Sequence, residues 1–337
     1  PFLIKPNLAE LSFVLGKKYS FKENENMFKL DVLIHGLDNM RGLNFDGVAY
    51  SLRTSPQIGP YFDRKKDKYE NRTFMSYSNN KQKKQMLGNN QMRTFDKEYS
   101  WTGVAGKYFT FLVVPVTPFN MGDVTYSTQL EKNNYANAQV MLTRNPIMQN
   151  SVTDTYYIYV GPRTEKDLRI YNKSDDNDWK LSGLRLNDSL NTSGILSWLE
   201  VAMKWIMEMI YKIIPNWGVA IIIMTILLRL VIYPLTKKSS ESTLKMQEFQ
   251  PKIQEIQTKY KDNPEKMNVE MAKLYKETGY NPLMGCLPLL IQFPLIIAMF
   301  NLFNNYFEFR GAMFIPGWIP DLSVGDSIYT LKFNLPL

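Results

Sequence analysis

The sequence contains very few of the residues that build disulfides, metal centres and most nucleophilic active sites. Among 337 residues there is one cysteine, Cys286, and one histidine, His35. A single cysteine cannot form an intrachain disulfide, and a structural zinc site needs several Cys or His ligands. One histidine also argues against a Ser-His-Asp or Cys-His catalytic site. We therefore expect no zinc site and no catalytic site of these two kinds, and we expect Cys286 to be a packed small residue.

Basic residues outnumber acidic ones, 40 to 32, for a formal net charge of +8. Such a balance can indicate a nucleic-acid partner, but here the lysines are scattered and no nucleic-acid-binding motif accompanies them. The densest basic cluster flanks an apolar block, as in the loops that set the orientation of membrane proteins. We therefore expect membrane topology, and no direct nucleic-acid partner, to explain the charge.

The two ends of the sequence lack the usual marks of a complete chain. It begins with PFLIKPNLAEL, without an initiator methionine or a signal-peptide pattern, and ends at KFNLPL. We expect it to be a portion of a longer protein.

Residues 1–190 predict an antiparallel β-sandwich. Short runs rich in β-branched and aromatic residues alternate with Gly, Pro, Asn and Asp, a pattern typical of strands in series. These runs are MFKLDVLIHGL (27–37), YFTFLVVPVT (108–117), DVTYSTQL (123–130), NAQVMLT (137–143) and TYYIYVG (155–161). The charged stretch 64–85 is expected to be a polar loop or an edge excursion, and residues 171–194 a linker with at most a short strand.

Residues 196–213 predict an amphipathic helix that lies in the membrane interface. Its charged residues recur every fourth position, which places them in one narrow stripe: Glu200, Lys204, Glu208 and Lys212. The wide apolar remainder includes Trp198, Val201, Trp205, Met209 and Ile213. Tryptophan favours headgroup depth, so Trp198, Trp205 and the following Trp217 are predicted interfacial anchors. The alternative is a helix packed on a soluble core.

Two apolar segments are long enough to cross a bilayer. Residues 216–235 contain one charge, and residues 281–307 contain none. The second segment holds three prolines, which membrane helices tolerate better than soluble ones. We predict transmembrane helices over both ranges.

The intervening residues 236–280 predict a helical hairpin. Phe249, Ile253, Ile256 and Tyr260 form one apolar seam, and Met267, Met271 and Leu274 form another. Asn263-Pro264-Glu265 has the form of a helix start, and Gly279 that of a helix end. Lys237 and Lys238 abut the first span and seven more lysines follow, so the positive-inside rule places the hairpin in the cytoplasm. Residues 1–190 and 308–337 are then expected on the other side.

Arg229 is the one charge inside the first span. An arginine within the bilayer costs roughly 2.5–3.5 kcal/mol on insertion scales, so something must offset it. Either the side chain extends to the cytoplasmic headgroups, or it faces a water-filled cavity between helices. Thr225 lies one turn away on the same face, and Gln292 interrupts the second span. Together they predict a hydrophilic groove, although Gln292 could also serve as an interhelical hydrogen-bonding group.

Three functions fit these features. A groove with one fixed cation would shorten the hydrocarbon path for a polypeptide entering the membrane and attract its carboxylates. A channel or transporter with an intramembrane anion site would call for more polar positions and inverted repeats, which the sequence lacks. A membrane-anchored envelope protein that binds through its β domain would leave Arg229 and the hairpin without a role.

The sequence resembles the YidC/Oxa/Alb family of membrane protein insertases. The resemblance runs from about Trp198 to Tyr329 through NWGVAIIIMTILLRLVIYPLT, the QPKIQ helix and NPLMGCLPLLIQFP. WTGVAGKYF and YVGP, more weakly, resemble the large periplasmic domain of family members from bacteria with two membranes. The resemblance implies a periplasmic β-sandwich followed by an α-helical membrane core, located in the bacterial inner membrane as a multi-pass protein.

The resemblance also implies a mechanism and partners. Arg229 matches the family's groove arginine, Thr225 the polar residue beside it, and 236–280 the cytoplasmic hairpin that receives substrate. Expected partners are nascent membrane proteins, the Sec translocon with its accessory proteins, the lipid bilayer and the ribosome. The resemblance implies no nucleotide, metal or other cofactor, and a protein that is not an enzyme. Family members of this type carry a further transmembrane helix before the β domain and others after residue 337. We therefore expect this chain to lack the helices that complete the groove.

Overall fold

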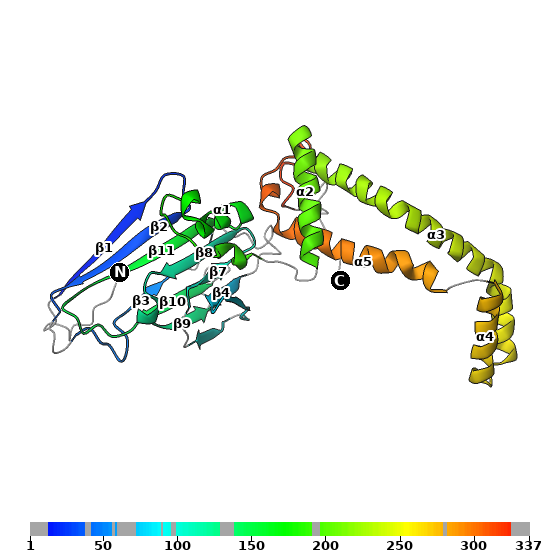
Figure 1. Cartoon of the computed structure of the whole chain (residues 1–337), viewed down its shortest axis with the longest axis horizontal. Coiled ribbons are helices and arrows are strands. Elements are labelled where there is room, and N and C mark those ends of the chain that lie inside the picture. Colours follow the sequence, from blue (N-terminus) through cyan, green and yellow to red (C-terminus); the bar gives the residue numbers. More distant parts are fainter. Residues whose placement is uncertain are drawn as a thin grey trace, which may run out of the picture. The chain divides into compact units, whose positions relative to one another are not determined.

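A computed structural model describes residues 13–37, 42–55, 58, 72–88, 90–95, 99–128, 138–190, 196–278 and 282–324. The chain divides into two compact units, Pro1–Asn191 and Thr192–Leu337. The first unit holds all the strands and the second holds the long helices (Figure 1).

The β unit contains a large antiparallel sheet of seven strands in the order β1-β2-β11-β8-β7-β4-β5. Its strands are β1 (Val14–Phe21), β2 (Met27–His35), β4 (Thr73–Ser78), β5 (Lys81–Gln85), β7 (Trp101–Ala105), β8 (Phe109–Pro115) and β11 (Ser151–Pro162). Edge strand β5 has the sequence KQKKQ. Lysines on an edge discourage pairing with another chain, so the basic stretch expected to be a loop or an edge excursion is, over residues 81–85, a protected sheet edge.

A second antiparallel sheet packs on the first. It has the order β3-β10-β9-β6, with strands β3 (Tyr50–Arg53), β6 (Met92–Phe95), β9 (Met121–Ser127) and β10 (Gln139–Arg144). The core between the sheets combines apolar residues that alternate along strands of both, including Ile34, Phe74, Tyr126 and Leu142, each at most 1% exposed. Burial of alternate residues from two facing sheets is the defining property of a sandwich, and it confirms the predicted fold class.

A buried ion pair crosses between the sheets. The Nε of Arg144 on β10 donates to Oδ2 of Asp154 on β11 at 3.0 Å, and the hydroxyl of Tyr50 on β3 donates to the same oxygen at 2.7 Å. The two charged side chains are 7% and 4% exposed. Because a buried charge is tolerated only when it is paired and hydrogen-bonded, this cluster fixes the alignment of the sheets.

The outer face of the large sheet is covered by residues 165–190. This segment contains α1 (Glu165–Arg169) and the short 3-10 helices Ile170–Asn172, Ser174–Asp176 and Leu186–Ser189. Its apolar side chains Tyr171 and Leu186 are fully buried in a core with Trp101 and Tyr159. The prediction of a linker over 171–194 is therefore wrong for residues 171–190, which belong to the β unit.

Within the residues described, the helical unit contains the α-helices α2 (Ser197–Ile213), α3 (Trp217–Lys259), α4 (Pro264–Thr278) and α5 (Pro282–Asn305), and the short 3-10 helix Phe307–Phe309. Helices α2, α3 and α5 share one core, in which Met203, Met207, Ala220, Met224 and Ala298 are at most 1% exposed. Helices α3 and α5 contact each other near the start of α3 and the second half of α5, and they diverge away from α2 (Figure 1). Ala220 and Ala298 permit this close approach because their side chains are small.

Helix α3 continues past residue 235, the predicted end of the first transmembrane span. It runs for 43 residues with Pro234 and Pro251 in its interior. Its apolar part, Trp217–Glu241, is the one helix in the described residues that is long and apolar enough to cross a membrane. In α5 the apolar stretch Leu289–Asn305 is shorter.

The C-terminal part of α3 and α4 contact each other, and the expected seams face the contact. Ile253 is 7% exposed, and Ile256, Met267, Met271 and Leu274 are partly buried. The predicted start of α4 is confirmed, since Oδ1 of Asn263 accepts a hydrogen bond from the Lys266 amide at 3.1 Å. The expected stop at Gly279 lies outside the described residues.

Candidate functional site

Arg229 and Thr225 lie on the same face of α3, near the middle of its apolar segment. Thr225 follows Ile221 by about one turn and Arg229 follows it by about two, and Ile221 packs against the helical core. Both side chains are exposed. The Thr225 hydroxyl donates to the Ile221 carbonyl at 2.8 Å, within its own helix. No hydrogen bond or ion pair of the Arg229 guanidinium is found in the parts of the chain that the structure describes.

Gln292 occupies the corresponding position on α5. It precedes Met299 and Phe303 by seven and eleven residues, and so lies on the same stripe of the helix. Met299 and Phe303 pack against the core, whereas Gln292 is exposed. Gln292 therefore lies beyond the last core contact of α5, whereas on α3 Thr225 lies between the core residues Ile221 and Leu228, and Arg229 directly follows Leu228.

Large exposed apolar side chains surround these polar residues on the apolar segments of both helices. Leu230 and Val231 on α3 are 63% and 76% exposed, and Leu289 and Phe293 on α5 are 67% and 63% exposed. Continuous exposed apolar surface of this kind is uncommon on soluble monomers and is typical of surfaces that meet lipid or another protein. Arg229 is thus an isolated cation on an otherwise apolar surface.

The three predicted interfacial tryptophans have two different environments. On α2, Trp198 and Trp205 are 67% and 61% exposed, beside the exposed Val201. Trp217 is only 9% exposed. Its ring stacks on Tyr211 with centroids 4.0 Å apart and meets Tyr306 edge-on at 5.2 Å. Trp217 is therefore a packing residue in this structure. Trp198 and Trp205 are exposed on α2, and their role as interfacial anchors stays a prediction.

The N-terminus of α3 is joined to the segment that follows α5. Oδ1 of Asn216 accepts from the Val219 amide at 3.1 Å and caps α3, while Nδ2 donates to the Phe314 carbonyl at 3.0 Å. A Cβ on Gly218 would lie 2.1 Å from Cδ2 of Phe314, so only glycine allows the Phe314 ring to sit against this turn. These contacts hold the residues after α5 at the same end of the helical unit as the start of α3.

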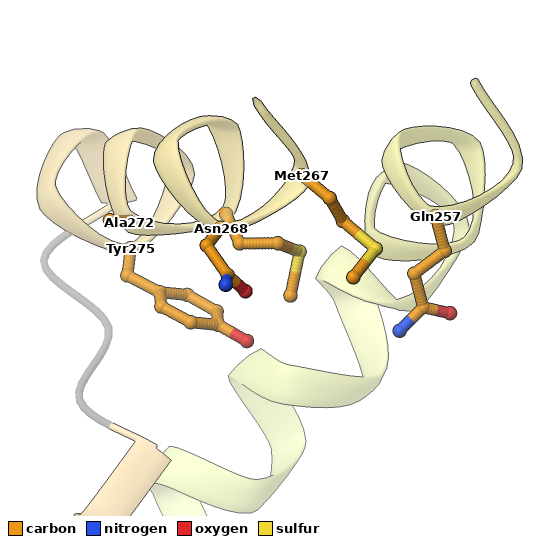
Figure 2. Close-up of a pocket in the computed structure, with 6 residues that line it drawn as sticks. Gln257, Met267, Asn268, Ala272 and Tyr275 are labelled. Atoms are coloured by element: carbon orange, nitrogen blue, oxygen red, sulfur yellow. The ribbon is translucent and has the colours of Figure 1, made fainter. Parts of the chain in front are cut away.

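The hairpin carries a shallow groove between its two helices. Figure 2 shows Met267 and Asn268 of α4 facing the end of α3 that carries Gln257. The groove has a volume of about 350 Å³ and is lined by Gln257, Met267, Asn268, Met271, Ala272 and Tyr275. Methionines adapt their shape easily, which suits them to a surface that accepts varied apolar side chains.

The described side chains offer no cluster of metal ligands. Among the side chains described, no group of three or more His, Cys, Asp or Glu residues could hold a metal ion. The Cys286 side chain lies outside those described.

The comparisons with known proteins agree with one another. Residues 209–337 match the family model described as 60Kd inner membrane protein. A protein of Treponema denticola, named membrane protein insertase YidC, is 49% identical over 330 residues, which are 97% of this chain and 56% of that protein. A protein of the same name from Treponema pallidum is 41% identical over 354 residues, which cover 96% of this chain and 57% of that protein. One from Chlorobaculum tepidum is 36% identical over 242 residues, 70% of this chain and 38% of that protein.

The chain belongs to the YidC family. It spans about half the length of the first two relatives, and its likeness to them extends through the β unit as well as the helices. The chain therefore belongs to a family of inner-membrane proteins, and this explains the exposed apolar surfaces of α3 and α5, since lipid would cover them.

Sequence reasoning found the polar residues of this YidC family chain but missed the contacts that position their helices. The aromatic group Tyr211, Trp217, Tyr306 and Phe309 joins α2, the start of α3 and the residues after α5. The hydrogen bond from the Asn216 side chain to the Phe314 carbonyl was also not predicted. The pattern Pro215-Asn216, followed by an apolar run, does carry the signal of an N-cap at Asn216, but nothing local indicates its second partner.

Proposed function

We propose that the complete protein is a membrane protein insertase that transfers nascent membrane proteins from the cytosol into the lipid bilayer. It works alone or with the Sec translocon and its accessory proteins, and it receives substrate from the ribosome. The observation that supports this most is Arg229: an exposed cation in the apolar segment of α3, in a chain similar to proteins named membrane protein insertase. The proposed role involves no covalent chemistry.

In this proposal α3 and α5 cross the membrane and contribute one wall of a hydrophilic groove. The span over 216–235 and the second span over 281–307 place the hairpin, 236–280, in the cytoplasm, with the β unit, residues 1–190, in the periplasm. The α2 helix, 196–213, then lies at the periplasmic face, and residues 308–337 begin on that side. Arg229, Thr225 and Gln292 line the groove, and helices outside this chain complete it.

The proposed mechanism is electrostatic. The Arg229 guanidinium carries a positive charge, as arginine side chains do in proteins. At 4 Å its attraction for a substrate carboxylate is about 1 kcal/mol in bulk water and about 4 kcal/mol at an effective dielectric constant of 20. Thr225 and Gln292 add groups that can hydrogen-bond water or substrate backbone. Polar parts of a substrate would enter this groove, and apolar parts would move sideways into lipid.

The test compares Arg229→Ala with Arg229→Lys in the complete protein. The assay measures insertion of a small coat-protein-like substrate whose translocated segment is acidic. We expect Ala to reduce insertion by about fivefold or more and Lys to keep most of it, because each 1.4 kcal/mol is a factor of ten. Replacing the substrate's acidic residues with neutral ones should remove the difference.

Leu230→Ala is the matched control. It alters an exposed neighbour of Arg229 on the same helix without changing charge. If Ala and Lys at position 229 both insert the acidic substrate as well as the wild type does, the groove charge has no role. The helices would then be better explained as an anchor for the β unit.

A further inference from the structure

The segment after α5 forms an apolar loop with an exposed tip. Residues 312–320, AMFIPGWIP, contain no charged, hydroxyl or amide side chain. Met313 is 51% exposed and Trp318 is 55% exposed, and Pro316 and Gly317 between them are also exposed. Loops that face water are normally polar, so this surface needs an apolar neighbour.

The loop has a defined fold. Ile315 and Ile319 form a β-bridge, and the Phe314 amide donates to the Ile319 carbonyl at 3.0 Å. Gly317 supplies the turn with a φ of +77°, a value that favours glycine. The Leu322 amide closes the loop by donating to the Ala312 carbonyl at 3.0 Å. Met313 and Trp318 are therefore held on a closed turn.

The loop is fastened at one end of the helical unit. Asn216 and Gly218, at the start of α3, hold Phe314 as described above. Ala312 and Leu322 pack against the core that contains Trp217 and Tyr306. The loop thus lies at the level where the apolar segment of α3 begins.

We propose that the 312–320 loop is a membrane anchor, with Trp318 and Met313 inserted at headgroup depth in the leaflet opposite the hairpin. Tryptophan is enriched at this depth because its ring is apolar while its indole N–H can hydrogen-bond. The exposed Trp198 and Trp205 of α2, which packs on the same core, present a second apolar surface of the same kind. This inference rests on the proposed placement of α3 across the membrane.

The test measures the depth of the loop with nitroxide spin labels. The complete protein, with Cys286→Ser and any other cysteine removed, receives one new cysteine as Trp318→Cys or as Met313→Cys. Each variant is labelled and reconstituted in vesicles of phosphatidylethanolamine and phosphatidylglycerol. Collisions with oxygen, which concentrates in lipid, are compared with collisions with a water-soluble nickel chelate. The matched control is Phe119→Cys, since Phe119 is an aromatic residue of the β unit that is 71% exposed.

We expect labels at 318 and 313 to collide more often with oxygen than with nickel, and the label at 119 to show the reverse. Preferential collision with nickel at both loop positions would mean that the tip lies in water, and would overturn the proposal. Slow collision with both reagents would also overturn it, since another segment or a second copy would then cover the loop. Insertion measured on the same variants is a separate readout, so a failed anchor leaves the groove proposal standing.

Discussion

The side-chain amide nitrogen of Asn216 donates a 3.0 Å hydrogen bond to the carbonyl oxygen of Phe314, 98 residues further along the chain. The oxygen of the same amide caps α3 by accepting from Val219 at 3.1 Å. One side chain therefore starts the long helix and fixes the segment that returns from α5. Its two roles use different atoms, so they can be separated by mutation.

Asn216→Ala should lower the free energy of unfolding of the helical unit by about 1–3 kcal/mol, because it removes a cap and a second hydrogen bond. Asn216→Asp keeps an oxygen for the Val219 amide but has no N–H for Phe314 when it is ionised. We expect Asp to fall between wild type and Ala in thermal unfolding followed by circular dichroism in detergent. Equal losses for Asp and Ala would show that the cap contributes nothing.

The Arg144–Asp154 pair of the β unit should behave as a coupled pair. Arg144→Met leaves a buried carboxylate without its cation, and we expect a loss of about 3–5 kcal/mol in the free energy of unfolding. Arg144→Met combined with Asp154→Leu removes both charges, and should cost much less than the sum of the single variants. Urea unfolding of the whole chain, followed by tryptophan fluorescence, gives these values.

The control for that pair is Arg185→Gln, which removes an ion pair whose Arg185 side chain is 53% exposed. Exposed pairs contribute about 0–1 kcal/mol, so this variant should change stability little. A simple sum of the Arg144 and Asp154 effects in the double variant would contradict the coupling.

Asp31 should make the β unit less stable in acid. Burial of Asp31 raises its pKa, but hydrogen bonds from Thr155 at 2.7 Å and from Lys29, together with the Lys29 charge, outweigh burial and lower the pKa below the usual value. A carboxylate whose pKa is lower in the folded state stabilises that state above its unfolded pKa, near 3.9. That stabilisation is lost as the pH falls through the lower, folded-state pKa.

We therefore expect wild type to exceed Asp31→Asn in the free energy of unfolding near neutral pH, with the difference shrinking below about pH 4. Urea titrations at several pH values measure this. Glu23→Gln changes an exposed carboxylate on the adjoining turn and serves as the control. A difference between wild type and Asp31→Asn that is constant with pH would indicate lost packing or hydrogen bonding without a role for titration.

The strands were predictable because their signal is local. In β2 the buried Leu30, Val32 and Ile34 alternate along the sequence, and this periodicity identifies both the strand and its inner face. The 171–190 segment was misread for the opposite reason. Its Tyr171 and Leu186 are spread among polar residues in short 3-10 turns, and they acquire a buried position only because the outer face of the large sheet is there to cover.

The candidate site divides in the same way. Arg229 could be identified from the sequence alone because it is the one charged residue within a long apolar run. The core that fixes its helix depends on Tyr211, Trp217 and Tyr306, which no short pattern connects. The continuity of α3 was not predicted because the span was ended where the apolar run gives way to Lys237 and Lys238. The residues that follow are rich in helix-forming Lys, Glu and Gln, and the helix continues.

The uninterrupted course of α3 links the hairpin mechanically to the residues around Arg229. A continuous helix tilts as one body unless a break in its backbone hydrogen bonds lets it bend. Pro234 has no amide hydrogen, so the Leu230 carbonyl lacks its usual partner one turn later. α3 therefore lacks one backbone hydrogen bond at the residue next to Arg229, and bending of the helix there would change the angle between the hairpin and the segment that carries Arg229.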